Sequence, residues 1–120
     1  MTGRSSLGRQ GENLAKKYFN QLGYSILNAN YQVGHLEIDL VTELSGQVVF
    51  VEIKTRLENQ DSLKENPLSR KQLTNLKKAI MAYCWNENIH PEKTRLDLLI
   101  ILVDSKKQSA RLRHYQDILN

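Results

Sequence analysis

Apolar residues in the first part of the chain recur at the spacing of an amphipathic helix. The pattern predicts a helix that starts near Leu7, with Ser5 and Ser6 as candidate caps, and that stops at Gly23. Its apolar stripe consists of Leu14, Ala15, Tyr18, Phe19 and Leu22. Residues 24–27 then form a short strand candidate, which we expect the turn-prone residues that follow to end.

The middle of the chain has the period-two pattern of strands. Residues 36–41 alternate apolar and acidic side chains, which predicts a strand with one buried face. Ser45 and Gly46 predict a turn, and residues 48–51 are apolar on both faces, as in a central strand. This second run continues through residues 52–54 without a turn residue. The polar stretch at residues 56–67 is interpreted as a surface loop.

The last half of the chain predicts a helix and one or two strands. Ser69 can cap a helix whose inner face carries Leu73, Leu76, Ala79, Ile80 and Tyr83. Residues 96–103 form an apolar strand, and residues 110–115 are a candidate edge strand. The order α-β-β-β-α-β indicates one α/β domain spanning residues 1–120, with its core at about residues 7–103 and two helices flanking a mixed sheet.

Composition excludes several classes of protein. No apolar stretch approaches the ~20 residues of a membrane-spanning helix, and the first residues lack the apolar segment of a secretory signal. The single cysteine, Cys84, excludes an intramolecular disulfide and a cysteine-based zinc site. We therefore expect a cytoplasmic protein without a membrane partner. The net charge of +4 is compatible with a polyanionic partner, although charge alone is weak evidence for one.

Two carboxylates and a lysine are the candidate chemistry. Strand alternation places Glu52 and Lys54 on one face, and a hairpin through residues 45–46 brings Asp39 beside them, with Glu37 nearby. Carboxylate oxygens hold Mg²⁺ or Mn²⁺, so Asp39 and Glu52 form a candidate metal pair. Lys54 can orient a water or stabilise charge on a phosphate. Periodicity alone fits a solvated ion-pair face at the end of a sheet equally well.

Several ordered motifs together resemble one known family. Gly8-x-x-Gly11-Glu12, residues 37–40 and residues 50–56 are similar to the YraN-type family of small bacterial proteins. The similarity covers about residues 8–103, and the ordered set is much more specific than any single motif. The family is regarded as a distant relative of archaeal Holliday junction resolvases, so the resemblance implies a restriction-endonuclease-like fold with a PD-(D/E)XK site.

The resemblance implies a role for each matching residue. Asp39 and Glu52 would be metal ligands, Lys54 the catalytic lysine, and Glu12 an additional acidic residue that binds metal or positions water. A helix N-terminal position favoured by the helix dipole explains Glu12 nearly as well. The chain departs from the usual pattern at two positions, where Gln32 replaces a common arginine and Leu36 a common glycine.

Two further basic residues are candidate nucleic-acid contacts. Arg56 follows the site directly, and Lys71 lies at the start of the second helix, although either can be an ordinary surface charge. The leading hypothesis is a Mg²⁺- or Mn²⁺-dependent endonuclease that acts on DNA, with branched or damaged DNA among the candidates. A homodimer is suggested only by analogy with relatives that cut symmetric junctions. The alternatives are a catalytically inactive nucleic-acid-binding module on the same fold and a small protein-interaction domain.

Overall fold

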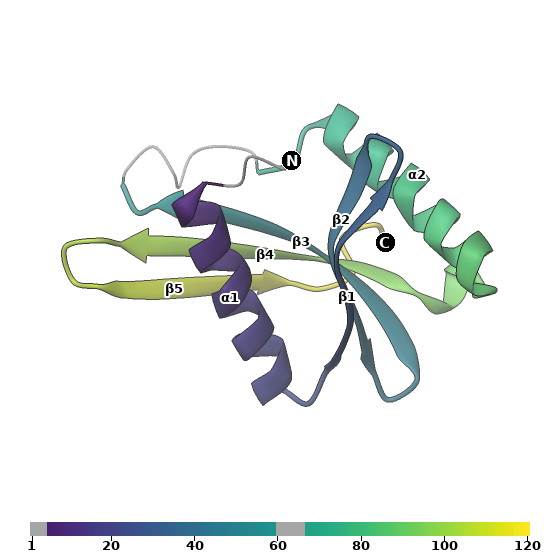
Figure 1. Cartoon of the computed structure of the whole chain (residues 1–120), viewed down its shortest axis with the longest axis horizontal. Helices are drawn as coiled ribbons and strands as arrows, with labels where there is room; N and C mark the ends of the chain where they lie inside the picture. The colour runs from purple at the N-terminus through teal and green to yellow at the C-terminus, as the bar shows by residue number, and fades with distance from the viewer. Residues whose placement is uncertain (1–4, 60–66) are drawn as a thin grey trace.

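The fold is a five-stranded sheet with one helix on each face (Figure 1). The computed structural model describes residues 5–59 and 67–120. The strands lie in the order β1-β2-β3-β4-β5, and only β3 and β4 are parallel. The elements along the chain are α1 (Ser6–Gln21), β1 (Ser25–Val33), β2 (Leu36–Leu44), β3 (Gln47–Leu57), α2 (Arg70–Glu87), the 3-10 turn η2 (Pro91–Lys93), β4 (Arg95–Asp104) and β5 (Ser109–Tyr115). This confirms the predicted α-β-β-β-α-β order, which β5 extends.

Both helices start at the predicted serines. The Ser5 hydroxyl accepts a hydrogen bond from the Gly8 N–H at 2.9 Å. Ser69 and Gln72 form a reciprocal capping box, in which each side chain accepts from the other residue's N–H. Asn88 ends α2 in the left-handed conformation. α2 lies in the connection between β3 and β4, where a parallel pair requires a crossover.

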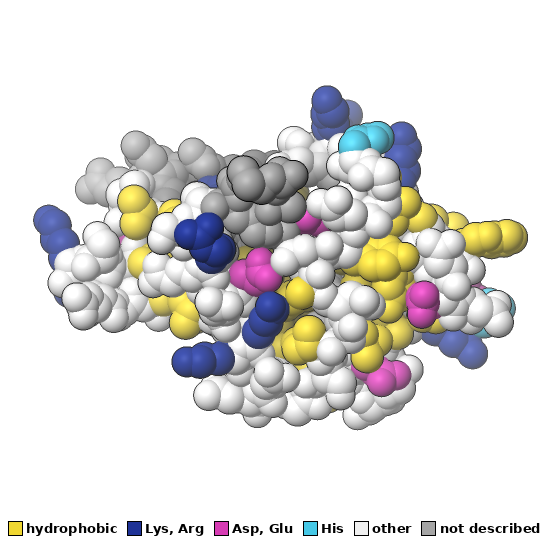
Figure 2. Space-filling view, viewed as in Figure 1, with side chains coloured by type: hydrophobic (Ala, Val, Ile, Leu, Met, Phe, Trp, Pro, Cys, Tyr) yellow, Lys and Arg dark blue, Asp and Glu magenta, His cyan; other side chains and the backbone are white. Residues whose placement is uncertain are grey.

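Each helix covers its own apolar core. Phe19 of α1 packs with Leu40, Val51 and Leu99 on one face of the sheet. On the other face, Tyr83 of α2 packs among the core residues Ile38, Val41, Phe50, Leu76 and Leu96. In the space-filling view, further apolar side chains gather at the α2 end of the molecule (Figure 2). Cys84 is buried there, whereas its neighbour Trp85 is 87% exposed.

Three details of the predicted elements are wrong or lie outside the description. β1 continues through Asn28 and Asn30 to Val33, because a bulge and a left-handed residue are accommodated within the strand. β2 is buried on both faces rather than on one, because each side of this strand is covered by a helix. Ile38 packs in the core under α2, and Leu40 packs in the core under α1. The predicted loop is strand up to Leu57, and its residues 60–66 lie outside the described part of the chain.

The backbone of α1 lies directly against β3 at Gly11. A Cβ atom built on Gly11 would lie 1.9 Å from Oγ1 of Thr55 and 2.8 Å from its Cβ. Only a glycine permits this approach, since an added methyl would push the helix away from the strand. The close approach of α1 to β3 at this point therefore depends on Gly11.

Gly11→Ala should destabilise the fold by about 1–3 kcal/mol despite the better helix propensity of alanine, because overpacking exceeds the propensity gain. Chemical denaturation measures the change. Gly8→Ala is the matched control in the same helix, because its Cβ would meet only the Ser5 hydroxyl at 3.3 Å. Equal stability of the two variants would contradict this role of Gly11.

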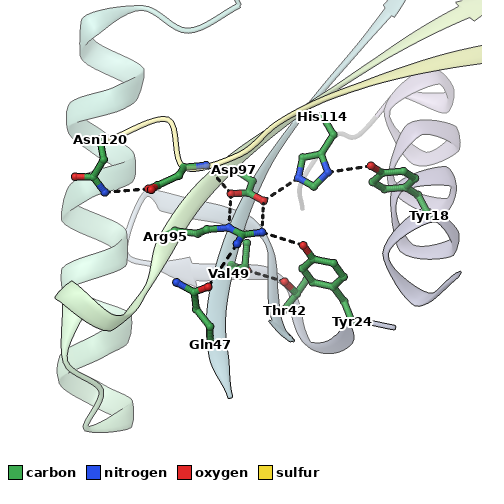
Figure 3. Close-up of polar contacts among 10 residues, drawn as sticks. Tyr18, Tyr24, Thr42, Gln47, Val49, Arg95, Asp97, His114 and Asn120 are labelled. Atoms are coloured by element: carbon green, nitrogen blue, oxygen red, sulfur yellow. Dashed lines mark hydrogen bonds and ion pairs between the residues drawn. The ribbon is translucent and has the colours of Figure 1, made fainter. Parts of the chain in front are cut away.

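A buried polar network ties the opposite end of α1 to the sheet (Figure 3). Asp97 is fully buried and accepts from Arg95 Nε at 3.0 Å and from the Asp117 backbone N–H at 2.9 Å. His114 Nε2 lies 2.7 Å from the Asp97 carboxylate, and its Nδ1 lies 2.9 Å from the Tyr18 hydroxyl of α1. The network thus joins α1, β4, β5 and the C-terminal segment.

Asp97→Asn should lower the free energy of unfolding by about 3–5 kcal/mol, because it leaves the partly buried Arg95 guanidinium without its counter-charge. Burial acts to raise the pKa of Asp97, but hydrogen bonds from His114, Arg95 and Asp117 hold it below its ordinary value of 3.8. The ionised carboxylate therefore stabilises the fold above pH 3.8, and this contribution is lost as the pH falls through the lowered pKa.

Urea denaturation between pH 7 and pH 3 tests this role. The wild type should lose stability toward the acid end more steeply than Asp97→Asn does. Glu92→Gln is the control, since the Glu92 side chain is 76% exposed. If Asp97→Asn lowered the free energy of unfolding at pH 7 no more than this control does, the network would contribute little to the stability of the fold.

Candidate functional site

The site lies where β2 and β3 separate. Their ladder ends at the pair Leu40–Val51, whereas the pairing of β2 with β1 extends further, to Leu36. The carboxylate of Asp39 lies at this fork, and its Oδ2 accepts a hydrogen bond from the backbone N–H of Ile53 at 2.8 Å. A side chain thus serves the β3 backbone at the place where the neighbouring strand has turned away.

Glu52 and Lys54 lie next to Asp39 on β3, as strand alternation predicts. Lys54 Nζ is 3.3 Å from Glu52 Oε2, and the two side chains are only 13% and 14% exposed. Burial raises the pKa of Glu52 to about 8, with further contributions from the Asp39 charge and from a hydrogen bond with Asp39; Lys54 acts in the opposite direction. Two carboxyls therefore share a confined space that favours a single negative charge.

A pocket of about 270 Å³ opens at the edge of β3 where β2 has separated from it, next to the first turns of α1. Asp39, Lys54 and Arg56 line it together with Glu12 and the first turn of α1. Figure 2 shows acidic side chains near the middle of the α1 face, with lysine and arginine side chains beside them. The pocket is therefore polar and carries both signs of charge.

Glu12 reaches this pocket from α1. Its Oε1 accepts from Asn30 Nδ2 at 2.9 Å and lies 3.3 Å from Lys16 Nζ. The sequence pattern alone does not determine whether the Glu12 side chain points toward the site. The structure places it in the same pocket as Asp39. The contacts with Asn30 and Lys16 limit the directions in which its carboxylate can turn.

Asn30 is a site-adjacent residue that the sequence interpretation missed. It has a φ of 53° inside β1, and its side chain binds Glu12. In the described part of the chain, its Oδ1 is the one buried side-chain nitrogen or oxygen that lacks a hydrogen-bond partner. Asparagine tolerates the left-handed conformation, so the residue type carries a signal for this position, but the same residue type also predicts the end of a strand.

The remaining candidates are divided by their distance from the pocket. Arg56 lines it, and its Nη1 donates to the Thr55 carbonyl oxygen at 3.1 Å. Lys71 is exposed in the first turn of α2 and does not line it. Glu37 accepts from Gln32 Nε2 at 3.3 Å and is also outside the lining. The structure thus brings Asp39, Lys54, Glu12 and Arg56 to one pocket and leaves Lys71 apart. Glu52 is not in the lining, but it contacts both Lys54 and Asp39.

The donor set fits a hard divalent cation. Asp39 and Glu52 provide adjacent carboxylate oxygens, and a cation would relieve the repulsion that raises the Glu52 pKa. Within residues 5–59 and 67–120, no group of three or more His, Cys, Asp or Glu side chains is arranged to hold a metal ion. This pair therefore suits an ion that takes its other ligands from water or substrate, as Mg²⁺ does.

Fold and site together define a class: a mixed α/β domain with two carboxylates and a lysine at the fork between two strands. The model of the uncharacterised protein family UPF0102 matches residues 11–101. A UPF0102 protein of Carboxydothermus hydrogenoformans is 32% identical over 117 residues, covering 98% of each chain. A second, from Syntrophomonas wolfei, is 36% identical over 108 residues, covering 90% of this chain and 92% of the relative. The chain belongs to the UPF0102 family.

This membership confirms the family that the sequence motifs resembled. Among solved structures, the chain is similar to an XisH family protein from Nostoc punctiforme, with a TM-score of 0.48 and 14% identity. That match covers 88% of this chain and 98% of the other. Among the helices of the described residues, none is long and apolar enough to cross a bilayer.

Glu52→Gln should stabilise the metal-free protein at alkaline pH. A carboxyl whose pKa rises from 4.5 to about 8 on folding keeps its proton in the folded state, so stability falls as the pH rises from about 4.5 to 8. The glutamine removes this loss, and we expect a gain of about 2–4 kcal/mol at pH 8.5 and little at pH 4.5. Chemical denaturation in EDTA at pH 8.5 and pH 4.5 measures this gain, and Glu87→Gln, at an exposed position of α2, is the control. A stability difference between Glu52→Gln and the wild type that is the same at both pH values would contradict the raised pKa.

Proposed function

We propose that the protein is a divalent-metal-dependent nuclease that hydrolyses DNA phosphodiesters, with branched or damaged DNA as candidate substrates. The observation that carries this proposal is the cluster of Asp39, Glu52 and Lys54 at the strand fork, beside a polar pocket. Buried charges at the end of an apolar strand cost stability, and a catalytic site explains why the fold keeps them.

Each side chain has a role in this proposal. Asp39 and Glu52 hold Mg²⁺ or Mn²⁺, which supplies Lewis-acid polarisation of a phosphodiester oxygen when bound. Lys54, already 3.3 Å from Glu52, donates to the phosphate and stabilises its developing charge or orients the attacking water. Glu12 positions water from the α1 side of the pocket, and Arg56 contacts a phosphate at its rim.

The test is cleavage of linear, flapped and four-way-junction DNA by purified protein with Mg²⁺, Mn²⁺ or EDTA. Metal-dependent products are expected from the wild type. Asp39→Ala should abolish them, and Lys54→Ala should reduce the rate by about 10²–10³-fold, because each removes a group that stabilises the transition state.

Lys78→Ala on the exposed side of α2 is the control for loss of a positive charge, and it should cleave like the wild type. Products that persist in Asp39→Ala would indicate a contaminating nuclease. Salt-sensitive DNA retention without any product would instead favour the catalytically inactive binding module.

A further inference from the structure

Strand β5 presents a basic and aromatic row on the face of the sheet opposite α1. Ala110 and Leu112 pack into the α1 core, and His114 bonds Tyr18 of α1. Strand alternation therefore directs the side chains between and after them to the other face, in agreement with the alternating burial of β5. This row, the β5 row, consists of Arg111, Arg113 and Tyr115.

The strand register connects the β5 row to the candidate site. Lys54 pairs with Ile100, which pairs with Arg113. In the same way, Arg56 pairs with Leu102, which pairs with Arg111. Lys54 and Arg56 alternate with Ile53 of the α1 core, so their side chains share the face of the β5 row. The basic side chains of β3 and β5 thus lie two strand spacings apart, about 10 Å.

The β5 row is accessible and lies outside the part of the face that α2 covers. The Arg111 side chain is 58% exposed, Tyr115 is 45% exposed and Arg113 is also exposed. The core under α2 includes Phe50 and Leu96, at earlier positions of β3 and β4. Arg111 forms an ion pair with Glu58, which follows β3 directly.

We propose that the β5 row binds single-stranded DNA, as an unpaired arm leading away from the site. The inference rests on the proposed function for its link to cleavage. Arg111 and Arg113 contact successive parts of the phosphate backbone, and Tyr115 stacks on a base. Arginines in line with an exposed aromatic ring suit a strand that carries both phosphates and free base faces.

The aromatic end of the row favours a single strand over a duplex. A base can stack on Tyr115 only when its face is free, and the faces of paired bases inside a duplex are covered by their neighbours. Positive charge alone would serve a duplex equally well. The two arginines therefore favour binding of a polyanion, and the tyrosine favours a single-stranded nucleic acid over a duplex.

The test measures binding of fluorescent oligo-dT and of a duplex of equal length in EDTA, where cleavage plays no part. Arg111→Ala/Arg113→Ala should weaken oligo-dT binding roughly tenfold or more. It should also reduce the slope of log K against log salt by about 1.4, for two lost phosphate contacts. Lys77→Ala/Lys78→Ala on α2 removes the same charge from exposed positions and should change binding much less.

Two single variants test the chemistry of the row. Tyr115→Leu should weaken oligo-dT binding about fivefold or more and leave duplex binding nearly unchanged, whereas Trp85→Leu, which removes an aromatic ring that is 87% exposed, should do neither. Glu58→Gln should strengthen binding, because it releases Arg111 from its ion pair.

Equal losses in the two double variants would overturn the proposal, as would a lack of oligo-dT binding by the wild type. Tighter binding of the duplex with no effect of Tyr115→Leu would also overturn it. Thermal denaturation of each variant verifies folding. Because the assay contains EDTA, a protein that binds through the β5 row but never cleaves DNA would contradict the proposed nuclease function and leave this inference intact.

Discussion

The separation of β2 from β3 is the constraint on which the site depends. A continuous ladder would leave no room for a pocket beside β3, whereas a bare fork would leave the Ile53 N–H without a partner, at a cost of about 1–3 kcal/mol. Asp39 resolves this conflict, because its carboxylate accepts that N–H at 2.8 Å. The same residue is therefore both a structural acceptor and a candidate ligand, and its orientation is set by the sheet before any ion or substrate arrives.

The second wall of the pocket depends on how closely α1 approaches β3. Gly11 brings the helix backbone onto Thr55, and the next residue in the chain is Glu12. Asn30 then holds the Glu12 carboxylate from β1. Three elements thus converge on the pocket through a backbone contact, a left-handed residue and a side-chain hydrogen bond. Such support from neighbouring elements is what a preorganised polar site requires.

Local signals predicted much of this structure. Capping serines and apolar stripes located both helices, and alternation placed Glu52 and Lys54 together, because these patterns depend only on neighbours in the chain. The fork could not be predicted, since regular alternation at residues 36–41 conceals a strand that is buried on both sides. Asn30 was misjudged because its residue type fits a turn as well as a left-handed strand position. Lys71 does not line the pocket, and its charge alone could not indicate its distance from it, since the path of the chain from β3 to α2 is not encoded in the residue type.

The charges of β5 have a consequence for the behaviour of the protein at high concentration. β5 is an edge strand, and in the described part of the chain it pairs with β4 alone, which leaves its other side as a possible site of pairing with another chain. Long charged side chains at alternate positions discourage such pairing, because stacking two copies would bring like charges together. Arg111 and Arg113 are thus placed where they also protect the edge of the sheet from aggregation. Selection for solubility would then preserve these positions whether or not the strand binds a polyanion.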